Sequence, residues 1–288
     1  MTATQTFEVN PLGPVMGAEI RGLDLSKPLS AQQWGALRAA YLQYQVLALR
    51  DQDLDEDQHQ AFAQRFGELQ VHVLNQYQKR GNPRVLVITN LKEDGTPIGE
   101  HPDPGAAIWH TDGSWSARRP LATMLYSLHI PKWGGDTLFA NMYAAYEGLS
   151  AAMKRRLEGV KAVHDLNYSR SQTNAKQQMT EEQRRAAPPV EHEIIRVHPE
   201  TGHKALYVGQ HASHIAGMPL DEGRALVNEV NAHATQDLYR YDHPWRLHDF
   251  VIWDNRCVMH KATEFDWMKD VRILRRTTTL GDRIPAFS

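Results

Sequence analysis

The sequence has little of several features that would place it in a special class of proteins. Its 288 residues contain one cysteine, Cys257, which excludes an internal disulfide and suits a reducing compartment. No apolar run approaches the roughly 20 residues of a membrane-spanning helix, and the start of the chain lacks the cationic and apolar segments of a secretory signal. With a net charge of -2, no basic excess favours nucleic acid or an anionic membrane. We therefore expect a cytoplasmic protein that binds neither nucleic acid nor a membrane.

What remains is an ordinary globular composition, with 41% apolar and 23% charged residues. The chain reads as many short apolar segments separated by turns, with helices predicted near residues 30–43, 55–66, 142–157 and 220–235. Because strands and helices do not alternate regularly, we expect a mainly β protein, an antiparallel sandwich or jelly roll with peripheral helices.

No linker divides the chain, so the sequence predicts one domain over residues 1–288. The stretch 169–189 is polar, rich in Gln and Arg, and followed by renewed strand patterning. It is predicted to be a mobile insertion or lid.

The most informative segment contains His110 and Asp112 between two tryptophans. In an extended chain, residues at i and i+2 point the same way, so the imidazole and the carboxylate would lie on one face. They would supply two ligands of a 2-His-1-carboxylate triad, which holds Fe(II) and leaves positions open for chemistry. A similar pair, His101 and Asp103, is flanked by prolines and reads as a loop. The alternative for His110 and Asp112 is a surface histidine followed by a turn-forming aspartate.

A triad needs a second histidine from a distant strand, and His260 is the candidate. Asp254 and Asn255 favour a tight turn after an apolar strand, and His260 closes the strand that returns. A hydrogen-bonded structural histidine is the alternative reading of this residue.

Near the C-terminus, residues 272–280 form an apolar, β-branched strand that carries three arginines. A period of two places Arg272 and Arg276 on one face and Arg275 on the other. Inward guanidinium groups are costly unless anions meet them, and arginine binds carboxylates with two parallel hydrogen bonds. The sequence thus predicts a carboxylate site, with internal ion pairs to Asp or Glu as the alternative.

These segments together resemble the Fe(II)/2-oxoglutarate-dependent dioxygenases of the taurine dioxygenase family. The resemblance rests on His110-Thr111-Asp112, Gly134-Gly135-Asp136-Thr137, Trp253 to His260, and Arg272 to Gly281, and spans nearly the whole chain in order. It implies a double-stranded β-helix, a form of jelly roll.

By that resemblance His110, Asp112 and His260 would bind the catalytic Fe(II), where O2 reacts. Arg272 and Thr137 would hold the distal carboxylate of 2-oxoglutarate, the co-substrate. Arg276 would lie near the anionic group of the substrate or the co-substrate. One departure is that twelve residue steps, rather than the expected eleven, separate His260 from Arg272.

Within the family, residues 202–214, 220–224 and 255–260 are most similar to the 2,4-dichlorophenoxyacetate dioxygenases. His72 matches a sulfonate-contacting histidine of the taurine enzymes, but Asn75 and Ala106 replace the two residues that contact the taurine amine there. An apolar-bodied anion therefore fits better, with Trp115 as a pocket aromatic. The expected reaction is hydroxylation beside an aryloxyalkanoate ether oxygen, which releases a phenol and an oxo acid with succinate and CO2.

Three alternatives stay open at this stage: a sulfonate or alkyl-sulfate dioxygenase of the same family, a non-catalytic jelly-roll protein that binds an anion, and a zinc hydrolase. A small anionic substrate is the expected partner, together with assembly into a homo-oligomer (dimer, trimer or tetramer).

Overall fold

A computed structural model describes residues 7–73, 78–79, 81–98, 104–173 and 179–285 of the chain. Its centre is a nine-stranded sheet that contains the first and the last of the described strands. The sheet is antiparallel apart from the pairing of β2 with β3. The strand order is β1 (Glu8–Pro11), β2 (Ala18–Arg21), β3 (Val46–Leu49), β15 (Phe250–Asp254), β7 (Pro120–His129), β17 (Ile273–Leu280), β6 (Asn82–Thr89) and β5 (Gln78–Lys79), with β4 (Glu68–Leu69) beside β17.

One face of this sheet is covered by two helices, α1 (Ala31–Tyr44) and α2 (Glu56–Gln64). Both begin with a capping box, on Ser30 and on Asp55, where the helices predicted at 30–43 and 55–66 start. Trp34 and Leu37 of α1 and Phe62 of α2 pack with the sheet residues Tyr126 and Phe250. The two helices thus shield one side of the sheet from solvent.

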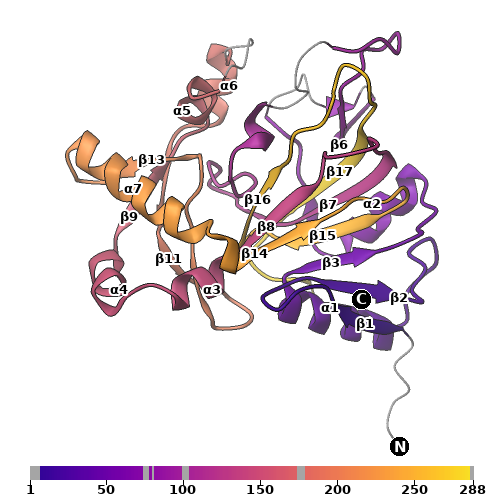
Figure 1. The fold of residues 1–288 in the computed structure, drawn as a ribbon, viewed down its shortest axis with the longest axis horizontal. Helices are drawn as coiled ribbons and strands as arrows, with labels where there is room; N and C mark the ends of the chain where they lie inside the picture. Colours follow the sequence, from indigo (N-terminus) through magenta and orange to yellow (C-terminus); the bar gives the residue numbers. More distant parts are fainter. Residues whose placement is uncertain (1–6, 74–77, 80, 99–103, 174–178, 286–288) are drawn as a thin grey trace, which may run out of the picture.

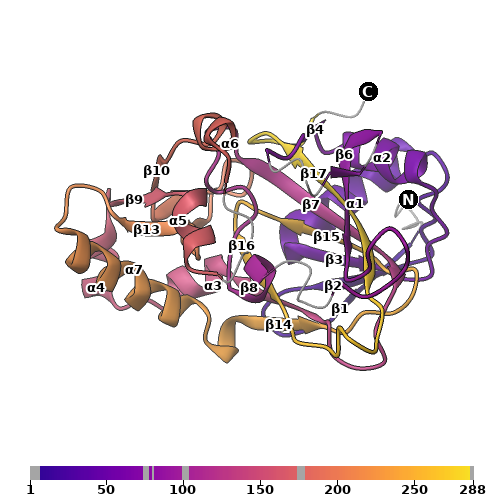
Figure 2. The same cartoon turned by 90° about the horizontal axis from the view of Figure 1, so that it is seen from above.

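The opposite face packs on a smaller sheet of β14 (Arg240–His243), β8 (Thr137–Asn141) and β16 (Val258–Ala262). Figure 1 shows this sheet at the centre, between the large sheet and a lobe formed by the middle of the chain, and Figure 2 shows the same arrangement from above. The two facing antiparallel sheets bear out the expected jelly roll with peripheral helices.

The lobe contains two small sheets and most of the remaining helices. Its strands are β9 (Lys161–His164), β10 (Val190–Glu193), β11 (Ile195–Val197), β12 (Lys204–Leu206) and β13 (Ala212–Ile215), and its helices are α3 (Met142–Glu147), α4 (Ala151–Leu157), α5 (Leu166–Ser171), α6 (Glu181–Ala186) and α7 (Leu220–Ala234). The described residues also include two 3-10 helices, η2 (Pro104–Ala107) and η3 (Asp237–Tyr239). Leu226, Val227 and Val230 form the buried side of α7, as its helical spacing predicts.

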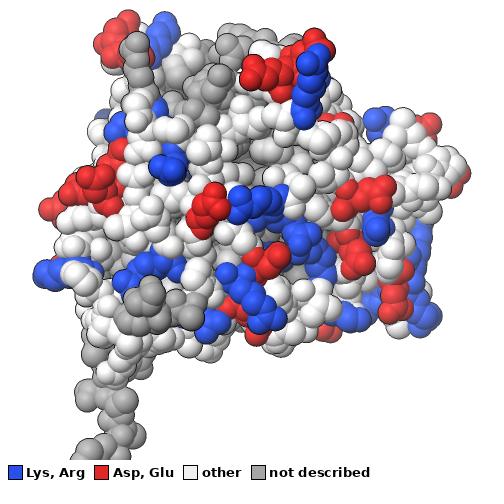
Figure 3. Space-filling model, turned by 180° about the vertical axis from the view of Figure 1, so that it is seen from behind, with Lys and Arg blue, Asp and Glu red and all other residues white. Residues whose placement is uncertain are grey.

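The surface agrees with the near-neutral composition. Acidic and basic side chains are intermixed on the face drawn in Figure 3. Within the described residues, no helix is both long and apolar enough to span a membrane.

Candidate active site

His110, Asp112 and His260 meet between the two facing sheets, although 150 residues separate the histidines. The backbone of His110 pairs with that of His260 through two hydrogen bonds of 3.0 and 2.8 Å, which extends the small sheet by one position. Oδ1 of Asp112 lies 3.6 Å from Nε2 of His110 and 3.8 Å from Nε2 of His260. The three side chains are buried, and their donor atoms lie within 4.8 Å of one another.

The donor set fits a divalent transition metal. Nδ1 of His110 lies 2.7 Å from the carbonyl oxygen of Ile108, which requires a proton on Nδ1 and leaves the Nε2 lone pair toward Asp112. Nδ1 of His260 is buried and has no hydrogen-bond partner among the described residues. Two imidazoles and one carboxylate are the ligands of the facial triad that binds Fe(II).

Asp112 is kept ionised by its surroundings. Burial alone would raise the pKa of this carboxyl. Arg276, whose Nη2 lies 2.9 Å from Oδ1, outweighs burial together with His260 and His110, and the pKa is held well below its usual range. Burial, with the neighbouring His110, lowers the pKa of His260 well below its ordinary value. The cluster therefore combines a carboxylate with a neutral imidazole, the forms that bind metals.

A chain of hydrogen bonds with a single direction orients Asp112. The indole Nε1 of Trp253 donates to Oδ1 of Asn255 at 3.0 Å, and Nδ2 of Asn255 donates to the hydroxyl of Thr123 at 2.9 Å. Thr123 then donates to Oδ2 of Asp112 at 2.7 Å. Since indole can only donate, each group in the chain has one possible role, and the Thr123 proton points at the carboxylate.

Arg272 lies immediately before β17 with its side chain buried. Its Nε donates to the carbonyl oxygen of Gly135 at 2.9 Å, and its backbone N–H donates to Asn90 at 2.9 Å. Burial lowers the pKa of Arg272 to about 10, against the opposing charge of Asp136. No carboxylate of the described part of the chain lies within ion-pair distance of this guanidinium. A buried guanidinium without a carboxylate partner is stabilised when an anion from outside the protein binds to it.

The turn at Gly134 and Gly135 allows its backbone to lie close to the Arg272 side chain. Both glycines have positive φ, 66° and 68°. A Cβ on Gly134 would lie 2.1 Å from the carbonyl oxygen of Glu264, and one on Gly135 would lie 3.1 Å from the Arg272 side chain. Thr137 follows as the first residue of β8, buried, and its hydroxyl accepts a 3.0 Å hydrogen bond from the indole of Trp245.

Arg272, just before β17, and the two arginines within that strand divide as the predicted period of two requires. Arg272 and Arg276 face the metal-ligand cluster side, where Arg276 pairs with Asp112. Arg275 faces α2, where it donates to the carbonyl oxygens of Leu54 and Asp55. The internal ion pair that the sequence left open thus exists for Arg276, and none is found for Arg272 in the described part of the chain.

Comparisons with known proteins agree with this geometry. The family model described as "Taurine catabolism dioxygenase TauD, TfdA family" matches residues 8–278. The chain belongs to this family. Among its relatives, the alpha-ketoglutarate-dependent 2,4-dichlorophenoxyacetate dioxygenase of Cupriavidus pinatubonensis is 36% identical, over 96% of this chain and 98% of that protein. The alpha-ketoglutarate-dependent sulfate ester dioxygenase of Pseudomonas putida is 32% identical, over 96% and 90%. A crystal structure of AAD-2 in complex with Mn(II) and N-oxalylglycine superposes with a TM-score of 0.85 at 33% identity, covering 98% of this chain and 99% of that one.

The residues expected on the substrate side of this dioxygenase are only partly described. The rings of His72 and Trp115 pack edge to face with centroids 5.8 Å apart. Trp115 is buried against Leu166, Met179 and Ala187. Two of these three, Met179 and Ala187, come from the stretch 169–189 that was predicted to be a lid.

Two other substrate-side positions are less informative. Ala106 lies in η2, which contacts β16, the strand that contains His260. Asn75 lies outside the described residues, as do the rejected pair His101 and Asp103.

A second group of potential ligands in the dioxygenase, His198, Asp254 and Cys257, has a structural explanation. Both oxygens of Asp254 accept from Arg256, at 2.8 and 2.7 Å, and Nε2 of His198 lies 3.2 Å from Oδ2. Nδ1 of His198 accepts from the backbone N–H of Thr201, so Nε2 carries the proton and donates to the carboxylate. Burial raises the pKa of the Cys257 thiol well above its usual value. These groups satisfy one another and leave no ligand for a metal.

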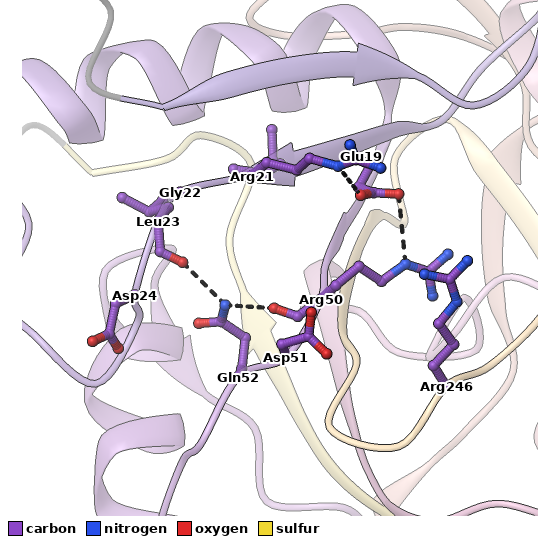
Figure 4. A pocket seen from close by; sticks show the side chains of 10 residues that line it. Glu19, Arg21, Gly22, Leu23, Asp24, Arg50, Asp51, Gln52 and Arg246 are labelled. Carbon is purple, nitrogen blue, oxygen red and sulfur yellow. Dashed lines mark hydrogen bonds and ion pairs between the residues drawn. The ribbon is translucent and has the colours of Figure 1, made fainter.

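A pocket of about 590 Å³ is lined by residues 19–24 in and after β2, residues 50–52 after β3, and Arg246 of the loop that follows β14. Figure 4 shows Arg50 and Arg246 extending into it, with Glu19 paired to Arg21 and Arg50. Acidic and basic residues line it in equal number, so its charges largely compensate one another. Arg246 lines this pocket, while its neighbour Trp245 is buried on the Thr137 side.

Sequence reasoning missed several residues of the site: Thr123, Asn255, Trp245 and His211. His211 is buried with its ring 6.2 Å from that of His110, and its Nδ1 lies 2.8 Å from the hydroxyl of Ser169. Burial lowers the pKa of His211 to about 3. No local pattern marks these residues. Trp245 and His211 act through partners more than 40 positions away, and Thr123 lies 11 positions from Asp112 and 132 from Asn255.

Proposed function

We propose that this chain is an Fe(II)- and 2-oxoglutarate-dependent dioxygenase that hydroxylates an aryloxyalkanoate. The observation that carries the proposal is a metal-ligand cluster paired with Arg276, together with a second guanidinium, that of Arg272, which is buried without a carboxylate partner among the described residues. Such a site has ligands for a metal ion, a guanidinium for a dicarboxylate and a second guanidinium for another anion. A non-catalytic anion-binding protein would not need the triad, and a zinc hydrolase would leave Arg272 unexplained.

In this proposal His110, Asp112 and His260 hold the iron, and Arg272 with Thr137 hold the distal carboxylate of 2-oxoglutarate. The bound iron, with 2-oxoglutarate and O2, supplies the oxidising power that replaces a substrate C–H hydrogen by hydroxyl while 2-oxoglutarate becomes succinate and CO2. The protein contributes binding and orientation: Asp112 supplies negative charge to the metal, and Thr123 fixes the direction of that carboxylate.

Arg276 is the proposed partner of the substrate anion, because it is the second guanidinium on this face and contacts Asp112 directly. Trp115 provides an apolar, aromatic wall for the body of the substrate. Met179 and Ala187 pack on it, and the segment 169–189 to which they belong is the proposed lid. Hydroxylation of the carbon beside an ether oxygen gives a hemiacetal, which separates into a phenol and an oxo acid. For a phenoxyacetate the products are the phenol and glyoxylate.

A sulfate-ester or sulfonate dioxygenase is the second candidate. Arg276 can hold a sulfate as readily as a carboxylate, and a relative at 32% identity is named for sulfate esters. Taurine itself is disfavoured, because alanine at position 106 offers no polar group to an amine. A cytoplasmic location and a homo-oligomeric assembly remain predictions of the sequence.

The test is a succinate-release assay with the anaerobically purified protein, Fe(II), 2-oxoglutarate and O2. Phenoxyacetates, phenoxypropionates, alkyl sulfates and taurine are compared at equal concentration. Phenol release coupled one-to-one to succinate with a phenoxyacetate supports the first candidate. Coupled turnover only with an alkyl sulfate favours the second, and no succinate with any compound contradicts both.

A further inference from the structure

We infer that Trp245 is a positioning residue for the co-substrate: its indole N–H sets the Thr137 hydroxyl to donate to the distal carboxylate of 2-oxoglutarate. The inference rests on the proposed function and adds a residue to it. Trp245 belongs to the loop after β14, and neither the His-x-Asp segment nor the arginine strand points to it.

The chemistry of the two groups determines the direction of the contact. Nε1 of Trp245 lies 3.0 Å from the hydroxyl oxygen of Thr137. An indole nitrogen donates and never accepts, so the Thr137 oxygen is the acceptor and cannot return its own proton to the ring. Among the described residues, no other hydrogen bond of this hydroxyl is found. Its proton is therefore available for an external acceptor.

The surroundings hold Trp245 in one orientation. Its ring is buried and meets the ring of His243 edge to face, with centroids 4.9 Å apart. Its backbone N–H donates to Asp136 at 3.4 Å. A rigid donor makes the Thr137 rotamer rigid as well, which lowers the ordering cost when a ligand binds.

The second donor to the same ligand group is positioned in a comparable way. Arg272 is held through Nε by the carbonyl oxygen of Gly135, two residues before Thr137. This leaves the terminal nitrogens of the guanidinium for the carboxylate. Each of the two side chains thus makes one hydrogen bond within the protein that orients it toward the ligand. For Arg272 the protein partner is Gly135, and for Thr137 it is Trp245.

The test compares two ligands that differ only at the distal end. Mn(II)-loaded protein is titrated by calorimetry with 2-oxoglutarate and with 2-oxopentanoate, which has the same keto-acid end but a methyl group in place of the distal carboxylate. We expect Trp245→Phe to weaken 2-oxoglutarate about three- to tenfold, the range of one neutral hydrogen bond. Binding of 2-oxopentanoate should change less than twofold. In steady-state assays, KM for 2-oxoglutarate should rise while kcat at saturation stays near the wild-type value.

Two further variants separate this role from a general structural one. In a Thr137→Val background, Trp245→Phe should produce no additional loss for 2-oxoglutarate. Trp133→Phe is the matched control, because Trp133 is 60% exposed, and it should bind both ligands as wild type does. If Trp245→Phe does not fold, 3-benzothienylalanine at position 245 replaces the N–H by sulfur and keeps the ring shape.

The outcomes distinguish the inference from the proposed function. Equal weakening of both ligands, or no weakening of 2-oxoglutarate, overturns the role of Trp245 while the preference of the wild type for 2-oxoglutarate stands. A wild-type protein that shows no such preference contradicts the proposed function and, with it, the inference.

Discussion

Replacing Thr123 by valine tests the hydrogen-bond chain that orients Asp112. The substitution preserves the branched shape of a buried side chain and removes the hydroxyl that donates to Oδ2 at 2.7 Å. A hydrogen bond to a charged group contributes about 1.5–3 kcal/mol, which corresponds to a factor of about 10 to 150 in affinity. Loss of a group that orients a metal ligand typically costs about 10- to 100-fold in metal affinity. We therefore expect Fe(II) binding, measured by anaerobic calorimetry, to weaken by about 10- to 100-fold.

The control is Thr279→Val, the same change in a buried strand residue whose hydroxyl contacts only the backbone of Ala122. It should lower the free energy of unfolding by less than Thr123→Val does and leave Fe(II) affinity within twofold of wild type. If Thr123→Val binds Fe(II) as tightly as Thr279→Val does, the Thr123 hydroxyl does not orient the metal carboxylate, and the argument fails.

Three other outcomes follow from the site. Arg272→Gln should raise the 2-oxoglutarate concentration needed for half-maximal succinate release by about 100-fold or more, since two charge-assisted bonds are lost; Arg275→Gln, on the opposite face, should lower stability without that shift. Arg276→Gln should raise KM for a phenoxyacetate more than KM for 2-oxoglutarate, and a uniform rise in both would argue against a substrate role. His211 has a folded pKa of about 3 against about 6.5 unfolded, so the unfolded state binds the proton first and stability falls as the pH drops below 6.5. At pH 5 this histidine should cost the metal-free protein about 2 kcal/mol relative to pH 7, at 1.36 kcal/mol per pH unit. Urea unfolding should show a flatter pH dependence for His211→Gln, and an unaltered slope would contradict the assignment.

Local patterns were sufficient for much of the fold. The capping boxes at Ser30 and Asp55 depend on residues three apart, and the buried side of α7 depends on spacings of three and four. Such interactions involve residues of a single helix, so they can be predicted from the sequence alone. The order of strands in the two sheets could not be read in this way. For example, β15 lies between β3 and β7, which come far earlier in the chain.

For the site, the sequence by itself determined the residue types and their faces: a His-x-Asp pair on an extended segment, a histidine on a returning strand, and arginines divided by a period of two. Only the tertiary structure decided which of these groups meet. The His110–His260 pairing, the Arg276–Asp112 ion pair, and the contacts of Thr123 with Asn255 and of Trp245 with Thr137 all join distant segments. The physical reason is that alternation along a strand depends on local backbone geometry, whereas a hydrogen bond across two sheets depends on how the whole core packs.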